Sequence, residues 1–478
     1  MNAEVVRLSE AVRKAGGRAM LVGGSVRDLL LGIDANDFDV EVYGLEAGLL
    51  RKVLEQLGDV NTVGEHFSVY KVVFFPPRTV DSAGQPVSRE STANERFEID
   101  VSLPRRESKS GRGHRGFVIE GNPAMSFEDA ARRRDFTINS LLLDPLTGEI
   151  IDSYGGRDDL IHRILRAVAA DTFIEDSLRV LRGVQLAARF EMTIEDQTVA
   201  LCRTIDLSDL PRERIWGEME KLLTLASRPS LGLEAALRLG VFEKLFPEFQ
   251  KLIIHQPEDP SPDEDLFTHT KVALDEAVKL VGDLSRPRRI AVMLASLCHE
   301  LGTPASIDLT ARDPLEENKP VRDATLSVLN KLGLFGIGGY DARSQVLALV
   351  SAHRKPREFY ESRESISDGD FRRLAQRVDL DLLYRVAKAC ALGSRLEVLT
   401  VAEDWFIRRA RALGVEHGPP APLLQGRHLV EAGFEPGPQM GRLLRSVYEL
   451  QLDGEVTTLE EALGVALSTG PTPPKVFR

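Results

Sequence analysis

The chain has 478 residues, a formal net charge of −12 and 43% hydrophobic residues. This length is too great for one ordinary hydrophobic core, so two to four domains are expected. A net negative charge is not typical of a nucleic-acid-binding protein, so any surface for nucleic acid has to be local. The sequence contains no run of about 18 apolar residues, and therefore no membrane-spanning helix is expected.

The cysteines and the first residues bear on the cellular compartment. The three cysteines are Cys202, Cys298 and Cys390. An odd and widely spaced set argues against a disulfide framework or a zinc finger, and favours a reducing compartment. The opening stretch, MNAEVVRLSEAVRKAGG, reads as an amphipathic helix and lacks the apolar run of a signal peptide. We therefore expect a cytoplasmic protein.

The periodicity changes along the chain. Residues 18–155 carry short β-rich runs, namely RAMLVG, DFDVEVYG, YKVVFF, FEIDVSL and the pair INSLLLD and EIIDSY. From about residue 160 the pattern becomes helical, for instance in IEDSLRVLRGVQLAARF and VALDEAVKLVGDL. The sequence thus predicts an α+β fold, in which a head with a mixed β-sheet is followed by a long all-α remainder.

Four polar stretches interrupt these elements. The stretches 78–97 and 105–116 are expected to be mobile loops. The proline-containing stretches 255–265 and 416–422 are expected to be linkers.

The segment LVGGSVRDLLLG, which begins at Leu21, has the features of a phosphate-binding turn. Glycines at 23 and 24 allow the backbone to approach a ligand closely, because no Cβ intervenes. A short helix is expected from about Ser25 to Leu31, and its free N–H groups would favour a phosphate. Arg27 lies in the first turns of this helix and would add a charge-assisted contact. Gly24, Ser25 and Arg27 are therefore the candidate nucleotide-binding residues of this segment.

Two carboxylates follow on the next expected strand. Asp37 and Asp39 are two positions apart, so their side chains lie on the same face of a strand. Two such carboxylates repel each other unless a cation lies between them, and Mg²⁺ prefers oxygen ligands of this kind. Asp37 and Asp39 are the candidate metal ligands. The alternative is a turn, a helix and an edge strand with two solvated acids.

Four motifs, in order, resemble those of one protein family. The first is GGSVRDLLLG followed by DFD, and the second is ARRRDFTINSLLLDPLTGEIIDSYGG at 131–156. The others are IEDSLRVLRGVQLAARF at 174–190 and LPRERIWGEMEKLL at 210–223. Together they resemble the class II tRNA nucleotidyltransferase and bacterial poly(A) polymerase family, within the polymerase-beta-like nucleotidyltransferases. The segment 423–444 resembles the tail of the CCA-adding branch.

The resemblance implies a reaction and its site. A tRNA 3′-hydroxyl attacks the α-phosphate of CTP or ATP, with Mg²⁺ as the cofactor and pyrophosphate as the leaving group. Asp37 and Asp39 would be catalytic metal ligands. Asp100, in FEIDVSLPR on another expected strand, is the candidate third carboxylate, and Glu98 on the same strand face is the alternative.

The second motif falls where the family contacts the nucleotide ribose. Arg134 would reach sugar hydroxyls or phosphates, and Asp135 would orient it, with Asn139 supporting the same loop. The alternative is a solvated basic run at a helix end. Asp152 and the following Gly155-Gly156 turn resemble the family's hinge between head and neck.

The third motif resembles a protein template that selects the base. Thr172 and Glu175 fit a T-x-x-E capping box that opens a helix, which is the preferred role for Glu175. Asp176 and Arg179 would then share one helix face. A carboxylate and a guanidinium fit the Watson–Crick edges of both cytosine and adenine, and would reject uracil and guanine. Arg182 would contact phosphate. The alternative for Asp176 and Arg179 is a surface ion pair.

The sequence departs from the family at one position of this motif. Gln185 stands where many relatives have a third arginine, which would help to hold the triphosphate. Glutamine brings no charge, so nucleotide affinity or the switch between CTP and ATP is expected to differ.

The middle of the chain resembles an HD phosphohydrolase-like domain with a broken ligand set. His269 and His299 remain, but Glu300 replaces the aspartate and Thr303 the lysine. No histidine lies between His299 and His353. We expect a helical scaffold without hydrolase activity, in which His353 and His428 are ordinary polar residues.

These readings combine into one expected organisation. The head spans 1–165, the base-selecting neck 166–254, the degenerate HD-like body 255–415 and the tRNA-binding tail 416–478. The expected function is template-independent CCA addition, with tRNA, CTP and ATP as partners and no obligate protein partner. The alternatives are a poly(A) polymerase, a partial CC- or A-adding enzyme, and a non-catalytic or hydrolytic tRNA-binding protein. A strongly basic C-terminal extension, usual in a poly(A) polymerase, is not seen in VALSTGPTPPKVFR.

Overall fold

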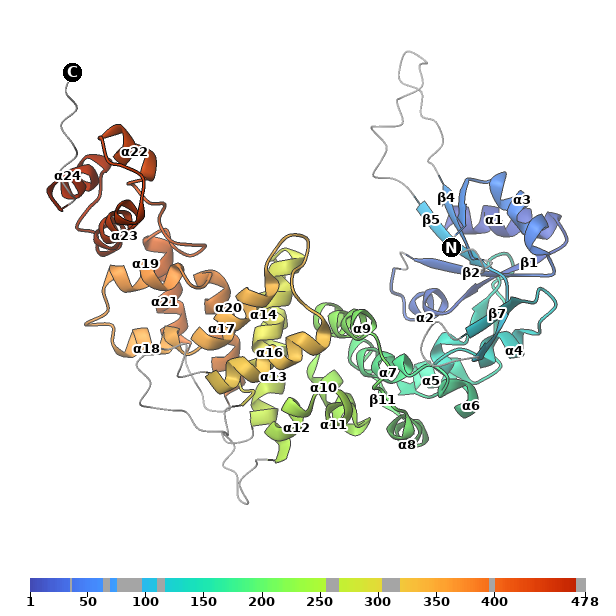
Figure 1. Cartoon of the computed structure of the whole chain (residues 1–478). Helices are drawn as coiled ribbons and strands as arrows, with labels where there is room; N and C mark the ends of the chain where they lie inside the picture. The colour runs from blue at the N-terminus through green and yellow to red at the C-terminus, as the bar shows by residue number, and fades with distance from the viewer. Residues whose placement is uncertain are drawn as a thin grey trace, which may run out of the picture. The chain divides into compact units, whose positions relative to one another are not determined.

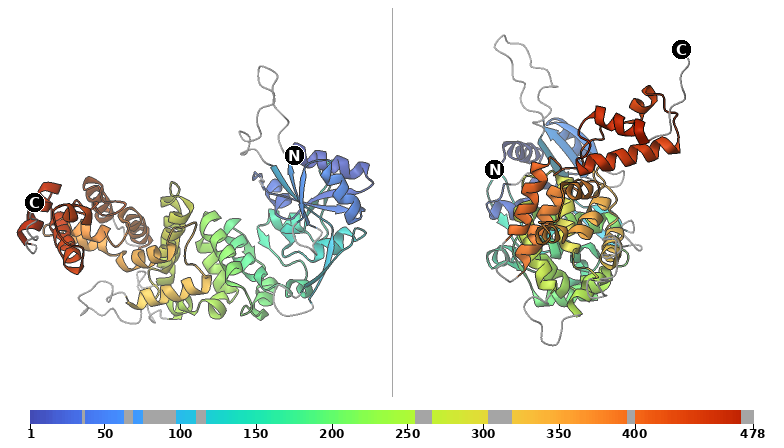
Figure 2. Two further views of the ribbon diagram at one scale, coloured as in Figure 1. Left: turned by 45° about the horizontal axis from the view of Figure 1, so that its top comes forward. Right: turned by 90° about the vertical axis from the view of Figure 1, so that its left-hand side faces the viewer.

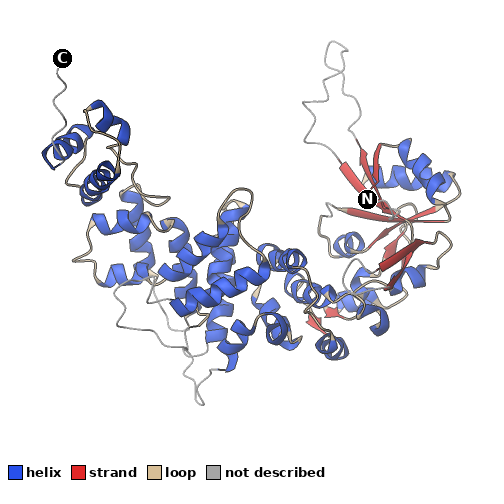
Figure 3. Ribbon diagram, viewed as in Figure 1, coloured by secondary structure: helices blue, strands red, loops and turns tan. Residues whose placement is uncertain are grey.

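The computed structural model describes most of the chain. The described residues are 1–34, 37–62, 69–74, 97–109, 117–254, 266–302, 319–394 and 400–469. They divide into two compact units, Met1–Glu218 with Leu231–Lys244 and Met219–Ser230 with Leu245–Arg478. The first unit holds a mixed β-sheet with helices, and the second is helical (Figures 1 and 3). The predicted α+β fold is thus confirmed, whereas the boundaries of the four predicted segments stay a prediction.

A seven-stranded sheet lies at the centre of the first unit, in the order β3-β4-β5-β2-β1-β8-β9. Its strands are β1 (Arg18–Val22), β2 (Phe38–Tyr43), β3 (Asp59–Thr62), β4 (Val69–Phe74), β5 (Phe97–Ser102), β8 (Leu142–Leu143) and β9 (Ile150–Ile151). Two small sheets join β6 (Arg105–Lys109) with β7 (Phe117–Gly121), and β10 (Ile164–Leu165) with β11 (Thr193–Ile194). Strands β2 and β5 are parallel, and the other named pairs of the large sheet are antiparallel.

The helices of the first unit surround this sheet and continue beyond it. They are α1 (Ala3–Lys14), α2 (Gly24–Leu30), α3 (Ala47–Glu55), α4 (Phe127–Arg132), α5 (Gly156–Ile161), α6 (Ala170–Phe173), α7 (Leu178–Arg189), α8 (Asp196–Thr204), α10 (Ser230–Arg238) and α11 (Val241–Leu245), with a 3-10 turn at Thr137–Asn139. Helix α9 (Arg212–Leu225) runs from the first unit into the second. The amphipathic helix expected at the N-terminus is confirmed as α1.

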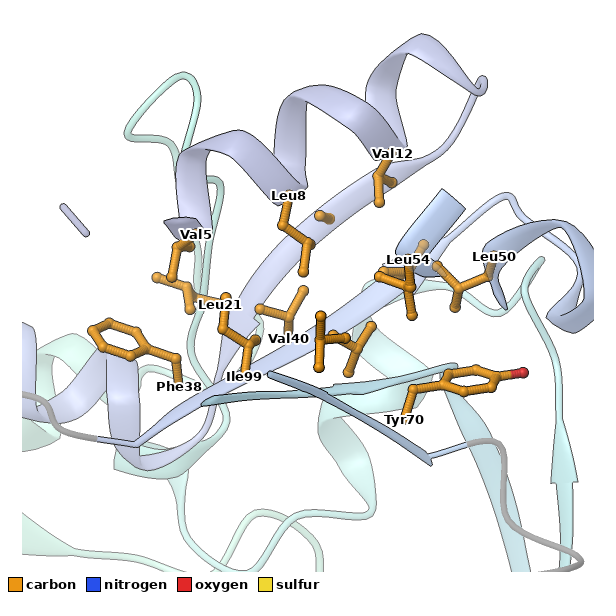
Figure 4. Close-up of a cluster of buried hydrophobic side chains, with 14 of the residues drawn as sticks. Val5, Leu8, Val12, Leu21, Phe38, Val40, Leu50, Leu54, Tyr70 and Ile99 are labelled. Carbon is orange, nitrogen blue, oxygen red and sulfur yellow. The ribbon is translucent and has the colours of Figure 1, made fainter. Parts of the chain in front are cut away.

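Helices α1 and α3 cover one face of the sheet, as Figure 4 shows. Leu8 of α1 and Leu50 of α3 are fully buried against Val40 of β2. Because side chains alternate along a strand, the buried Phe38 and Val40 leave the residues between and beside them on the opposite face. The core of the first unit therefore determines which face carries the acidic residues of β2.

The expected strands of the head are confirmed, but one expected loop is not. Residues 105–109 form β6, which pairs antiparallel with β7. The polar composition of residues 105–109 did not indicate a strand. The strand forms because it pairs with residues 117–121, and such pairing is not apparent from local propensity. The remaining parts of the two expected loops, 78–96 and 110–116, lie outside the described residues, as does the expected linker 255–265.

The second unit consists of packed helices, seen in two further views in Figure 2. They are α12 (Pro247–Ile254), α13 (Leu266–Leu280), α14 (Arg286–Cys298), α16 (Lys319–Leu332), α17 (Ala342–Ala352), α18 (Lys355–Glu361), α19 (Asp368–Ala375), α20 (Leu380–Gly393), α21 (Val401–Ala412), α22 (Gly426–Glu431), α23 (Pro438–Asp453) and α24 (Leu459–Thr469). Over the ranges that the structure describes, every helix is too short or too polar to cross a membrane.

All three cysteines are buried and are not joined in disulfides. Burial raises the pKa of the Cys202 thiol to about 12, and it raises the pKa of Cys390 well above its ordinary value. Thiols of this kind pack as small apolar groups and are chemically inert.

Candidate functional site

Three carboxylates share the face of the sheet that α1 and α3 leave uncovered. Asp39 of β2 lies directly opposite Asp100 of β5 in the parallel register. Asp37 precedes β2 by one residue, so it lies on the same face as Asp39. All three residues are exposed. The structure therefore brings together the two carboxylates of the first motif and the predicted third one from a strand about sixty residues further on.

The electrostatics of Asp39 reflect this grouping. Loss of water around the carboxyl raises its pKa above the ordinary value, and the charges of Asp100 and Asp37 raise it further, while Arg134 opposes them. Carboxylates that repel one another in this way form a donor set suited to a divalent cation. The carboxylate oxygens of Asp37, Asp39 and Asp100 do not all lie within 4.8 Å of one another. In two other groups of described residues, the possible metal-ligand atoms do lie that close together.

The alternative third carboxylate, Glu98, already has a cation as its partner. Lys71 of β4 lies opposite Asp100, and its Nζ is 2.8 Å from Oε2 of Glu98. The hydrogen bond to Glu98 raises the pKa of Lys71, followed by the charge of Asp100. Glu98 is thus turned toward Lys71, whereas Asp100 lies beside Asp39.

A fourth acid on this face, Glu41, was not predicted from the sequence. The residue is 1% exposed, and its carboxylate accepts hydrogen bonds from Tyr43 Oη at 2.9 Å, from Arg134 Nη2 at 3.2 Å and from Arg133 Nη2. Glu41 therefore holds two arginines of the second motif against the acidic strand. The signal was present as the third acid in D-x-D-x-E, two positions after Asp39.

The glycine pair makes room for arginines of the protein itself. A Cβ at Gly23, where φ is +70°, would lie 3.0 Å from Nη1 of Arg134 and 3.9 Å from Oδ2 of Asp39. A Cβ at Gly24 would lie 3.3 Å from Nη2 of Arg27. The groups that lie close to these two glycines are therefore the guanidinium groups of Arg134 and Arg27. The prediction that Gly24 contacts a nucleotide stays a prediction.

Ser25 links the glycine turn to the acidic strand. Its hydroxyl accepts a hydrogen bond from the Asp39 backbone N–H at 3.1 Å and donates one to the Val22 carbonyl at 3.3 Å. Ser25 is buried, so its contacts position Asp39. A direct contact of Ser25 with nucleotide stays a prediction.

A chain of polar groups, buried except at the partly exposed Arg182, connects α2 to α7. Arg27 Nη1 donates to Asn139 Oδ1 at 2.7 Å, and Asn139 Nδ2 donates to Asp135 Oδ1 at 3.0 Å. Arg182 Nε donates to Asp135 Oδ2 at 2.6 Å. Arg27 also pairs with Asp28 and lies over the Phe190 ring, 4.2 Å from its centroid. Asn139 thus supports this loop, as the sequence indicated.

Asp135 orients a different arginine from the expected one. Burial alone would raise the pKa of Asp135, but the charge of Arg182 and hydrogen bonds from Asn139, Arg182 and the Phe136 N–H hold it below its ordinary value. The ionised carboxylate therefore anchors Arg182, whereas Arg134 is held by Glu41. The assignment of Asp135 as the partner of Arg134 is wrong, because the two side chains point to different elements.

The second glycine pair lies at a tight junction. The Asp152 carboxylate accepts hydrogen bonds from the Gly156 and Arg157 N–H groups at 2.8 and 2.9 Å, which caps the start of α5. Gly155 has φ of +74°, and a Cβ at Gly156 would lie 2.2 Å from the Thr137 carbonyl oxygen. Both glycines are thus required by the local backbone. Whether this junction is a hinge stays a prediction.

The third motif does not open a helix directly after Thr172, as the capping box predicted. Residues 170–173 form the short helix α6, a turn follows, and α7 begins at Leu178. The hydroxyl of Thr172 donates to the carbonyl oxygens of Arg132 at 2.8 Å and Ala169 at 3.3 Å. The predicted capping box is therefore wrong, because tertiary contact with the end of α4 takes the Thr172 side chain.

Asp176 consequently lies in the turn before α7, and not on a helix face with Arg179. Its Oδ1 and Oδ2 accept hydrogen bonds from Nη1 and Nη2 of Arg214 at 3.2 and 3.0 Å. The Arg179 guanidinium donates to the carbonyl oxygens of Thr172 and Arg133. The third and fourth motifs thus meet through Asp176 and Arg214, a pair that the sequence did not predict.

Gln185, which stands in place of the family arginine, is buried in α7. Within the described part of the chain its Oε1 has no hydrogen-bond partner. A neutral amide is therefore buried in α7. Its effect on nucleotide affinity stays a prediction.

The second unit brings together the histidines of the HD-like region. His269, His299 and Glu300 have ligand atoms within 4.8 Å of one another. His353, despite its distance in sequence, packs its ring against that of His299 with centroids 5.4 Å apart. His269, Glu300 and His353 border a cavity of about 280 Å³ that also has Cys390 and Glu403 in its lining. The predicted loss of hydrolase activity is not tested by this arrangement and stays a prediction. Thr303 lies outside the described residues.

The hydrogen bonds of His299 fix its tautomer. Nδ1 lies 2.8 Å from the Ser296 carbonyl oxygen, which can only accept, so Nδ1 carries the proton. Nε2 then directs its lone pair toward His269 Nε2 at 3.0 Å. Burial lowers the pKa of His299 to about 3. The imidazole is therefore neutral at pH 7.

This lowered pKa predicts acid sensitivity of the second unit. The unfolded chain binds a proton at His299 near pH 6.5, and the folded chain only near pH 3, so stability falls as the pH drops through this window. The slope is about 1.4 kcal/mol per pH unit for one proton. Urea unfolding of the parent and of His299→Asn between pH 7 and 4 should show a shallower dependence for the variant. The exposed His162→Asn is the matched control, and equal slopes for all three proteins would contradict the assignment.

Comparison with known proteins supports the motif analysis. Residues 19–166 match the model of the Poly A polymerase head domain, and residues 191–253 match the model described as "Probable RNA and SrmB- binding site of polymerase A". The Multifunctional CCA protein of Xylella fastidiosa (strain M23) is 34% identical over 293 residues. The match covers 60% of this chain and 62% of that protein. The corresponding protein of Pasteurella multocida (strain Pm70) is 36% identical, with coverage of 60% and 64%. The chain therefore matches about three fifths of the length of these curated relatives.

Solved structures share the fold over almost the whole chain. The Thermotoga maritima CCA-adding enzyme complexed with tRNA is 19% identical with a TM-score of 0.57, and the alignment covers 98% of this chain and 96% of that one. The Bacillus stearothermophilus CCA-adding enzyme in complex with CTP is 19% identical with a TM-score of 0.62, and 97% of each chain is covered. At this identity the likeness concerns the fold. The resemblance inferred from the four motifs is confirmed.

Proposed function

On the premise that residues 19–166 belong to the Poly A polymerase head-domain family, we propose that this protein is a tRNA nucleotidyltransferase. It adds CCA to the 3′ end of tRNA from CTP and ATP, releases pyrophosphate at each step, and needs no nucleic-acid template. The observation that carries this proposal is the pairing of Asp39 with Asp100 beside Asp37 on one sheet face, next to the arginines of the second and third motifs.

The donor set fits a divalent metal cofactor, which we propose to be Mg²⁺. Asp37 and Asp39 would hold it, with Asp100 as the third carboxylate, because three mutually repelling oxygens on one face are the ligand type that Mg²⁺ favours. When bound, the metal supplies a lower pKa for the attacking hydroxyl and neutralises charge on the phosphates.

The arginines of the head and neck orient the nucleotide in this proposal. Arg134, which Glu41 holds near Asp39, would contact the ribose and phosphates. Arg182 is anchored to Asp135 through Nε, and its Nη groups would donate to phosphate oxygens. Arg27 stabilises the same network from α2 and is itself buried. Such prepositioned charges are the main contribution that a protein makes to phosphoryl transfer.

The neck selects the base in this proposal. Cytosine presents an amino group beside the N3 acceptor, and adenine presents one beside N1. Asp176 would accept from either amino group, and Arg179 would donate to the neighbouring ring nitrogen. Uracil and guanine reverse this order and would leave buried polar groups unpaired, which can reject a substrate by a factor on the order of 10⁴.

The other parts of the chain have proposed roles as well. We retain the head at 1–165, the neck at 166–254, the body at 255–415 and the tRNA-binding tail at 416–478. The fold that the chain shares with the CCA-adding enzyme bound to tRNA supports tRNA as the partner. Three buried, unpaired cysteines are consistent with a cytoplasmic location.

One assay tests the proposal and separates its alternatives. Purified protein is incubated with Mg²⁺, each nucleotide, and tRNA transcripts that end before C, after CC and after CCA. The proposal expects C and A to be added until CCA is complete, and no extension of the third transcript. Continued addition of A identifies a poly(A) polymerase, and use of only one of the first two transcripts identifies a partial enzyme. Binding of tRNA without any incorporation would leave the non-catalytic alternative.

A further inference from the structure

A bidentate ion pair ties the turn before α7 to α9. Arg214 Nη1 lies 3.2 Å from Oδ1 of Asp176, and Arg214 Nη2 lies 3.0 Å from Oδ2. The two side chains are 31% and 29% exposed, so both retain access to solvent and to a ligand. A partly exposed ion pair of this kind contributes little to stability. Its two parallel hydrogen bonds instead fix the plane of the carboxylate.

A second contact holds the same turn from the same side. The Ser177 hydroxyl donates to Asp209 Oδ1 at 3.0 Å, and Asp209 lies in the segment just before α9. The Asp176 carboxylate is therefore held by Arg214, while the backbone next to it is held by Asp209.

The hydrogen bonds of Asp176 leave it one acceptor site. A carboxylate offers about four lone-pair sites, two on each oxygen. Oδ1 accepts from Arg214 Nη1 and, at 3.1 Å, from the Leu178 N–H. Among the described residues, Oδ2 accepts only from Arg214 Nη2. One site on Oδ2 is thus free, which is the number that a single amino N–H of a base requires.

We infer that Arg214 is a positioning residue that sets base selection without touching the base. This inference rests on the proposed function, in which Asp176 accepts from the amino group of cytosine or adenine. The hydrogen bonds from Arg214 orient the free acceptor site on Oδ2 of Asp176. The Arg179 guanidinium donates to two backbone carbonyl oxygens, and its remaining N–H groups would donate to the ring nitrogen of the base. Without Arg214 the carboxylate rotates, and an oriented pairing becomes a fluctuating one.

The test compares Arg214→Ala with Arg212→Ala, a change at an exposed arginine two positions earlier on α9. Equilibrium dissociation constants for CTP, ATP, UTP and GTP are measured first. We expect Arg214→Ala to weaken CTP and ATP about tenfold, the value of one oriented hydrogen bond, while UTP and GTP change less than about twofold. Arg212→Ala should leave the four ratios unchanged. A uniform loss over all four nucleotides would mean that Arg214 only supports the fold, and would overturn the inference.

Two further variants separate orientation from charge. Arg214→Lys keeps the charge but cannot make two parallel hydrogen bonds. This variant should therefore discriminate between the nucleotides almost as poorly as Arg214→Ala. Full recovery by lysine would overturn the inference. Asp176→Ala combined with Arg214→Ala should discriminate no worse than Asp176→Ala alone, because Arg214 acts through Asp176. A further loss in the double variant would contradict that route.

Failure of the inference on Arg214 can be distinguished from failure of the proposed function. A parent protein that binds CTP and ATP selectively but adds neither to tRNA would contradict the function, and the binding ratios of the Arg214 variants would still decide this inference. A parent protein that adds nucleotides, with an Arg214→Ala variant that keeps the parent ratios, would overturn the inference alone. Thermal unfolding of each variant verifies that it is folded.

Discussion

Asp39→Ala should reduce nucleotide incorporation to about a thousandth of the parent rate or less, and Asp37→Ala should act similarly. The reason is the loss of a carboxylate from the face that Asp39 shares with Asp100, which weakens cation binding and the neutralisation of phosphate charge. Several kcal/mol of transition-state stabilisation correspond to about three powers of ten in rate. The measurement is the initial rate of addition to a tRNA transcript ending in CC, with saturating ATP and Mg²⁺.

A matched control separates this effect from a general loss of structure. Asp59→Ala removes an exposed aspartate from the edge strand β3, which β4 and β5 separate from β2 in the sheet, and should leave the rate within about twofold of the parent. Binding of tRNA by Asp39→Ala, followed by filter retention, should persist because the proposed tRNA contacts lie in the neck and tail. Rates within about tenfold of the parent for both Asp37→Ala and Asp39→Ala would refute the proposed metal site.

Asp176→Ala should weaken the use of CTP and ATP and relax discrimination against UTP and GTP about tenfold to a hundredfold. The carboxylate accepts from the amino group, and without it Arg179 can donate to an oxygen or to a ring nitrogen without preference. Each lost pairing is worth about 1–3 kcal/mol. The measurement is kcat/KM for each of the four nucleotides on a tRNA ending in CC.

Two comparisons sharpen this result. Arg182→Ala should weaken all four nucleotides alike, because a phosphate contact carries no information about the base. Glu213→Ala, at an exposed acid in the first turn of α9, should change nothing measurable. If Asp176→Ala loses activity with unchanged base preference, Asp176 serves only to hold the turn through Arg214, and base selection has to reside in other side chains.

The sequence by itself determined the features that depend on local spacing. Alternation placed Asp37 and Asp39 on one strand face, and the burial of Phe38 and Val40 confirms that assignment. Short β-rich runs predicted six strands of the head, which are β1, β2, β4, β5, β8 and β9. These inferences succeeded because the β-rich composition of a run and the alternation of side chains along a strand are local properties that need no knowledge of the neighbouring strands.

Only the tertiary structure decided which of these residues meet. The register of β2 with β5 places Asp100 beside Asp39, and Glu41 meets Arg133 across 92 positions of the sequence. Contact with Arg132 diverts Thr172 from its expected capping role, and the start of α7 at Leu178 leaves Asp176 to Arg214, 38 positions away. A side chain that could form a hydrogen bond with several different residues forms it with the one that folding brings close. That choice is set by long-range contacts, which no local pattern in the sequence encodes.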